Sequence, residues 1–349
     1  MNSLFSSACA LLGILFTGCN ESGSNSDRDF QENLEKQYWL DQYGNIDSTE
    51  ISIDDFSPAT DCKECHESHY EEWNRSMHAY SMRDPIFFSG KKQAQDHFPL
   101  TGERFCIQCH SPAAFLTGED LTGFSSPEEL MGAGYPPAIT DGVSCDICHT
   151  ITSFSETIRT EDDVSASADS YHLNAGAGIK YGSIENPQSN TYHESEYKPI
   201  FKRSELCLPC HDMTIRGVDA EITFTEWNDI TGLSMFAALS CQECHMKQKT
   251  DGSHDHRFVG VDIDLSYPVG QSPLHDLVQD MLESAVDLQF GYLNFALPDT
   301  IISGDSLIIP ITIKSKTAHS IPSGTSFSRE AWLAVKVTIV TNTIDSLWY

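Results

Sequence analysis

The sequence predicts a mainly α-helical and irregular fold, followed by a small β unit at the C-terminus. Between residues 60 and 260, one five-residue motif recurs at intervals of 44, 39, 62 and 34 residues. Apart from one helix candidate at residues 68–82, no long amphipathic pattern lies between the copies, and glycine and proline interrupt the chain at residues 132–137 and 176–182. After Pro298 the apolar residues alternate with polar ones, as they do in β-strands.

The repeated motif is Cys-x-x-Cys-His, the attachment sequence of c-type haem. One helical turn places both thiols on the same face, where they can bond the two vinyl groups of one porphyrin. The adjacent imidazole can then ligate the iron. The cofactor-binding residues predicted in this way are Cys62, Cys65 and His66; Cys106, Cys109 and His110; Cys145, Cys148 and His149; Cys207, Cys210 and His211; and Cys241, Cys244 and His245. We therefore expect five haems c, with short helices and coil wrapped round the haem stack.

Zinc sites and redox-active disulfides also use Cys-x-x-Cys pairs. Zinc does not require a histidine directly after every pair, and four-cysteine sites use the pairs two at a time, whereas this chain has five. A redox motif normally occurs once. Ten of the 12 cysteines lie in the five motifs. Only Cys9 and Cys19 remain, both near the N-terminus, so no cysteine is left for a structural disulfide in the rest of the chain.

The N-terminus carries a short apolar run over residues 4–16, too short to span a bilayer and typical of a signal peptide. It ends in Phe16, Thr17, Gly18 and Cys19, which resembles the lipobox of bacterial lipoproteins. An ordinary cleaved signal with a coincidental cysteine is the alternative. Lipidation of Cys19 would anchor the protein to a membrane, and we expect an exported protein, periplasmic or on the outer membrane or cell surface.

The formal net charge of −30 disfavours nucleic acid as a partner, because phosphate contacts need lysine and arginine. The charge could steer the protein toward a basic redox partner, although a solvated acidic surface explains it equally well.

We expect five regions along the chain. They are a signal peptide at 1–19, an acidic flexible tether at 20–58, a pentahaem domain at 59–265, a linker at 266–298 and a β-rich domain at 299–349. Apolar spacing predicts helices at 68–82 and 273–288. Alternation predicts strands at 306–314 and 331–341. The β unit would be sandwich-like, and its pattern stops mid-strand, which leaves open whether the chain is a fragment.

Nine histidines lie outside the motifs and could supply a sixth iron ligand. They are His69, His78, His97, His172, His193, His254, His256, His275 and His319. Five irons need at most five of them, and a lone histidine is as often a solvated or hydrogen-bonded side chain. Neutral imidazole is the natural distal ligand for a low-potential haem.

The surroundings of several of these histidines resemble the cytochrome c-554 family and related multihaem proteins. The first motif is followed by Trp73 and then by His78-Ala79, and Gly142-Val143-Ser144 precedes the third motif. Further likenesses are His110-Ser111-Pro112, His193 ahead of the fourth motif, Met246 followed by His256-Arg257-Phe258-Val259-Gly260, and His319-Ser320-Ile321-Pro322-Ser323-Gly324. The resemblance spans residues 60–340.

The resemblance implies that His78, His193, His256 and His319 are distal ligands. The fifth stays open between His97 and His172, with His254 less favoured, and no histidine is assigned to a particular iron. The family has four haems, one of them five-coordinate. By analogy, the haem on His110 would be the one with a vacant position.

Three functions fit these features. An electron carrier needs nothing beyond closely packed haems, and it is the interpretation we favour. An electron-transfer subunit of a larger complex, docked through the β unit, is compatible with it. A haem enzyme acting on a small nitrogen or sulfur species would need an open iron. The lysine that replaces the motif histidine in ammonia-forming nitrite reductases is absent from all five motifs.

Overall fold

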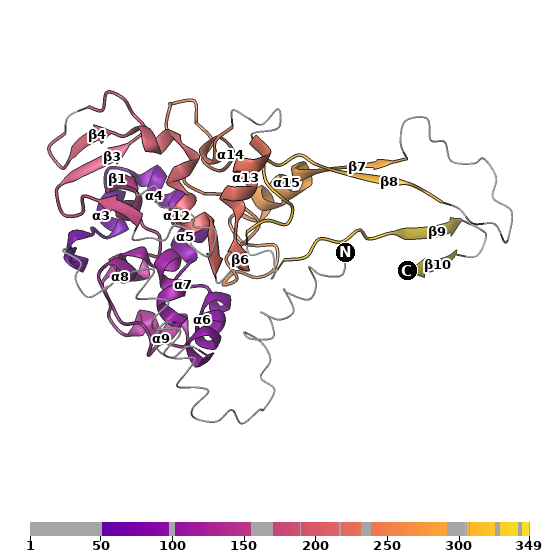
Figure 1. Ribbon diagram of the computed structural model, residues 1–349, viewed down its shortest axis with the longest axis horizontal. Helices are drawn as coiled ribbons and strands as arrows, with labels where there is room; N and C mark the ends of the chain where they lie inside the picture. The colour runs from indigo at the N-terminus through magenta and orange to yellow at the C-terminus, as the bar shows by residue number, and fades with distance from the viewer. Residues whose placement is uncertain are drawn as a thin grey trace.

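The computed structural model describes residues 51–97, 102–154, 170–188, 190–215, 218–231, 239–291, 304, 306, 308–324, 329–340 and 344–348. The predicted signal peptide, Cys19 and most of the tether lie outside the described residues. Within this part of the chain, helices are short and sheets have two strands each, as Figure 1 shows. Among the described residues, no helix combines the length and the apolar character needed to cross a membrane.

The helices gather in the haem-motif region, which agrees with the predicted fold class. The α-helices are α3 (Ala59–Lys63), α4 (Glu67–Trp73), α5 (Met77–Tyr80), α6 (Pro85–His97), α7 (Gly102–His110), α8 (Pro112–Leu116), α9 (Pro127–Gly132), α10 (Pro137–Thr140), α11 (Cys145–His149), α12 (Leu208–His211), α13 (Thr223–Thr231), α14 (Cys241–His245) and α15 (His275–Ala285). The 3-10 turns are η2 (Ile53–Asp55), η4 (Pro199–Lys202) and η5 (Ser204–Leu206).

The strands among the described residues form five two-stranded ladders. β1 (Ile151–Phe154) pairs with β2 (Tyr171–Leu173), β5 (Met213–Ile215) with β6 (Val218–Glu221), β7 (Val286–Phe290) with β8 (Ile311–Ser315), and β9 (Lys336–Val340) with β10 (Ile344–Trp348), all antiparallel. β3 (Ile179–Gly182) and β4 (Glu194–Tyr197) are parallel, with Ile179 opposite Glu194. β7 and β8 form a ribbon that leaves the helical body (Figure 1).

The main apolar core takes its buried side chains mainly from α6, α7, α8 and α9. Phe88, Ile107, Phe115 and Leu130 are buried there among other apolar side chains. The buried Lys91 ammonium donates to the carbonyls of Leu121 and Phe124, at 2.7 and 2.8 Å, and so fixes the loop after α8. This core supports α7, which carries the second motif.

Two predicted helices differ from the structure. The helix expected at 68–82 is broken into α4 and α5, because Ser76 has extended backbone and its hydroxyl caps α5 by accepting from Ala79 N. The helix expected at 273–288 ends at Ala285, and Val286 begins β7, inside the segment predicted as a linker. The predicted strands at 306–314 and 331–341 overlap β8 and β9. Their sandwich-like packing stays a prediction.

Candidate haem-binding sites

Each Cys-x-x-Cys-His motif forms a turn of helix. The amide of His66 donates to Cys62 O at 2.9 Å, and that of His211 donates to Cys207 O at 3.0 Å. The third and fifth motifs coincide with α11 and α14, and the second forms the end of α7. The two cysteines of a motif are three positions apart, so their thiols face the same side of a turn, as attachment to one porphyrin requires. We number the sites 1 to 5 after His66, His110, His149, His211 and His245.

Four motif imidazoles each face one histidine from a distant part of the chain. The pairs are His66 with His193, His149 with His256, His211 with His78, and His245 with His319. In every pair the ring centres are 6.3 Å apart. The partners are the four histidines that the family resemblance singles out.

This common spacing fits one metal ion held between two imidazoles. A ligating ring nitrogen lies about 2 Å from a first-row metal ion, and a five-membered ring with bonds of about 1.33 Å has a radius of about 1.1 Å. Ring centres on opposite sides of an ion are therefore about 6.2 Å apart. The four pairs lie close to this distance, so the residues fit an iron held by two imidazoles.

Backbone carbonyls orient the rings. The Nδ1 atom of His149 lies 2.7 Å from Tyr181 O, and that of His245 lies 2.7 Å from Val259 O. Among the distal partners, His256 Nδ1 is 2.9 Å from His254 O. A carbonyl can only accept, so Nδ1 carries the proton and Nε2 is left for the metal ion.

Burial keeps these imidazoles neutral, which is the form that binds metal. It lowers the pKa of His78 to about 3, and the imidazoles of His211, His110 and His245 lower it further. Burial likewise lowers the pKa of His256 to about 4, and it lowers the pKa values of His149 and His245. His78, His149, His245 and His256 are thus in the ligating state at neutral pH.

Site 2 differs from the other four. The ring of Phe87, at the start of α6, stacks on His110 with centres 4.0 Å apart and planes 14° from parallel. Among the described side chains, no histidine ring faces that of His110. Burial lowers the pKa of His110 to about 4.

The three remaining candidate ligands lie in different surroundings. His97 is the last residue of α6, and its side chain lies outside the described residues. His172 is exposed on β2. His254 Nδ1 is 2.8 Å from Met246 O, and the described ring contacts pair its neighbour His256, not His254, with a motif histidine.

Motif cysteines of different sites meet in space. The thiols of Cys62 and Cys145 lie close together, as do those of Cys109 and Cys210 and those of Cys207 and Cys241. Cys148 lies near Cys210. These contacts join site 1 to site 3, site 3 to site 4, and site 4 to both site 2 and site 5.

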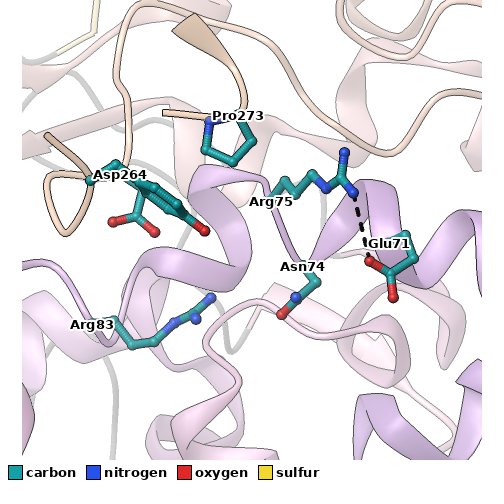
Figure 2. Close-up of a pocket in the computed structure, with 7 residues that line it drawn as sticks. Glu71, Asn74, Arg75, Arg83, Asp264 and Pro273 are labelled. Atoms are coloured by element: carbon teal, nitrogen blue, oxygen red, sulfur yellow. Dashed lines mark ion pairs between the residues drawn. The ribbon is translucent and has the colours of Figure 1, made fainter. Parts of the chain in front are cut away.

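A cavity of about 470 Å³ lies beside α4 and α5. Figure 2 shows the side chains that line it. Arg75 and Arg83 line it together with Glu71 and Asp264, and Arg75 points toward Glu71 at 3.9 Å. The lining includes no cysteine and no histidine. This cavity therefore contributes nothing to the five sites.

Two comparisons with known proteins found a match, one in sequence and one in fold. Residues 61–150 match the family described as Cytochrome c554 and c-prime. The structure is similar to the crystal structure of a penta-heme cytochrome c552 from Thermochromatium tepidum, with a TM-score of 0.56 and 21% identity over 79% of this chain and 69% of that chain. No curated protein sequence matches the chain. The chain therefore resembles the cytochrome c554 family over residues 61–150, and its fold is similar to that of a penta-heme cytochrome, so the predicted resemblance is confirmed.

Proposed function

We propose that the protein relays electrons through five covalently bound haems, four of which have two imidazole ligands. The observation that supports this most directly is the common 6.3 Å spacing of four histidine pairs. His66, His149, His211 and His245 are the proximal ligands, and His193, His256, His78 and His319 are the respective distal ligands. Bound haem supplies the one-electron chemistry, and the chain holds and orients each iron by its imidazoles.

The contacts between motif cysteines support a relay. A haem bound through Cys62 and one bound through Cys145 would be neighbours, and Cys207 and Cys210 place site 4 beside three other sites. An electron entering at site 1 would pass to site 3 and then to site 4. From there it could leave by site 2 or by site 5.

Intact-mass spectrometry tests the haem count. Protein matured in a host with the cytochrome c machinery should carry the mass of five haems. A Cys106→Ala, Cys109→Ala double variant should carry one fewer, and a Cys9→Ala variant should be unchanged. Protein without covalent haem would overturn the proposal, and a count other than five would overturn the assignment of one haem to each motif.

A second function has a specific observation in its favour. His110 faces no histidine among the described side chains, and Phe87 packs on its ring, so site 2 could hold an iron with an open position. A small nitrogen or sulfur species could then bind there. Carbon monoxide added to the reduced protein should shift the spectrum of one haem in five. No shift would assign all five haems to electron transfer alone.

We also propose that the protein is exported and held at a membrane by lipid on Cys19. The apolar run and the small residue before Cys19 support this. Cells fed labelled palmitate should label the wild-type protein and the Cys9→Ala variant, but not Cys19→Ala. Label retained by Cys19→Ala would contradict the anchor.

A further inference from the structure

Residues 256–259 contact three of the five sites within four positions. His256 faces His149 of site 3. The ring of Phe258 lies against His78, the partner of His211 in site 4, with ring centres 4.4 Å apart. The carbonyl of Val259 accepts from His245 Nδ1 of site 5 at 2.7 Å.

Phe258 has a backbone conformation that its residue type disfavours. Its φ of 48° lies in the left-handed region, and among the described residues other than glycine it alone does so. A bulky side chain is rarely found there, because Cβ approaches the following carbonyl oxygen. Such strain persists only where the surroundings hold it, and it often marks a functional constraint.

The contacts of the phenyl ring explain what holds this conformation. The ring meets His78 and His256 edge to face, with ring centres 4.4 and 5.9 Å apart and interplanar angles of 60° and 84°. The segment before it is fixed to α4, because His256 N donates to Glu72 at 3.1 Å, and Lys249 pairs with the same carboxylate at 2.8 Å. Phe258 thus fills the space between two partner histidines that belong to different sites.

We propose that Phe258 is a positioning residue that sets the ring orientations of His78 and His256 together. Its left-handed backbone lets the ring enter between the two imidazoles while the next carbonyl turns toward His245. This inference rests on the proposed ligand pairs. It adds that sites 3, 4 and 5 share one mechanical element, so that a change at Phe258 alters more than one haem.

The test uses low-temperature EPR and a spectroscopic redox titration of the complete haem-loaded protein. Phe258→Gly removes the ring but tolerates a positive φ. We expect the low-spin signals and the midpoint potentials of two haems, those of sites 3 and 4, to move. Phe258→Ala also removes the ring, but alanine favours a negative φ, so the carbonyl of Val259 should shift and the signal of site 5 should move as well.

Phe201→Leu is the matched control, because among the described histidines Phe201 stacks only on His149, with ring centres 5.7 Å apart. It should alter only the signal of site 3. Each variant is compared at a full count of five haems. If Phe258→Gly binds fewer haems, Phe258→Leu replaces it and must move the same two signals.

Unchanged signals and potentials in the Phe258 variant, even with lowered thermal stability, would overturn the positioning role and leave the ligand pairs intact. Wild-type protein that lacks the signals of haems with two imidazoles would instead overturn the pairs themselves, and with them the role of Phe258.

Discussion

Gly142 shows how one residue can fix two sites. Its φ is +69°, and a Cβ there would overlap Ser81 Oγ and lie 2.5 Å from His78 O. Ser81 Oγ in turn lies 2.8 Å from His78 O and 2.7 Å from His110 O. Glycine therefore allows the loop before the third motif to approach the backbone of a distal and of a proximal histidine.

Gly142→Ala should lower the free energy of unfolding by about 2–5 kcal/mol, from the left-handed backbone and the steric overlap together. Gly178→Ala is the matched control, because Gly178 has a φ of +70° with open space around its Cβ position. It should cost only about 1–2 kcal/mol. Guanidinium unfolding of the haem-loaded proteins measures both values, and equal losses would contradict the packing argument.

Two histidines that are two residues apart have different roles in this structure. His256 faces His149, whereas the Nδ1 of His254 lies against a carbonyl. His256→Ala should convert one low-spin haem to high spin because it removes the proposed distal ligand, and His254→Ala should leave all signals as they are. EPR of the two variants measures this, and the reverse pattern would show that the wrong histidine was chosen.

The proximal residues could be predicted from the sequence because five contiguous residues contain the whole attachment chemistry. The distal partners could not be derived from spacing, since 127 positions separate His66 from His193 and 133 separate His78 from His211. Resemblance identified the four partners, and only the three-dimensional structure matches each with its motif. The sequence did not predict the role of Phe258, which it marked only as part of the segment that resembles the family. A positive φ at phenylalanine is set by tertiary packing, which the sequence pattern does not reveal.

At the scale of elements, short ladders bring distant segments to the sites. In the parallel pair β3–β4, the carbonyl of Tyr181 on β3 lies against His149 Nδ1. His193, which faces His66, directly precedes β4. These strands have only four residues each, and β4 is largely polar, so the usual alternation did not reveal them. Helices α4 and α5 were predicted as one for a related reason: the apolar spacing continues across the Ser76 cap.

Helix α13 anchors the segment that carries His319. Glu226 accepts from Ser323 Oγ at 2.6 Å and from Ser320 N at 3.2 Å, and Thr223 Oγ1 lies 2.8 Å from Ser323 Oγ. The histidine that faces His245 is therefore held by hydrogen bonds to a helix about 100 residues earlier in the chain.

Glu226→Ala should leave the backbone of Ser320 without its carboxylate partner and loosen His319. We expect a temperature-dependent high-spin fraction at one haem and a loss of about 1–3 kcal/mol in the free energy of unfolding. Asp229→Ala, on the exposed face of the same helix, is the control and should change neither. Variable-temperature absorption spectra report the spin state, and a fully low-spin Glu226→Ala protein would refute the anchoring role.

At the scale of the whole molecule, we expect the charge of −30 to attract basic partner proteins. Attraction to a basic partner weakens as salt shortens the screening length to about 8 Å at 0.15 M. The rate of electron exchange with a basic monohaem cytochrome c should fall about tenfold or more between 20 and about 300 mM salt. Exchange with an acidic partner is the control and should speed up. A rate that does not depend on salt with either partner would show that the net charge does not influence electron exchange with other proteins.

The central claim is that four irons are each held between two histidines. Low-temperature EPR of the oxidised protein, with a haem count from the pyridine haemochrome spectrum, tests it most directly. We expect five haems, of which at least four give low-spin ferric signals of the two-imidazole type, with the fifth reporting the state of site 2. Fewer than four such signals from a protein with five haems, or no covalent haem at all, would contradict the account.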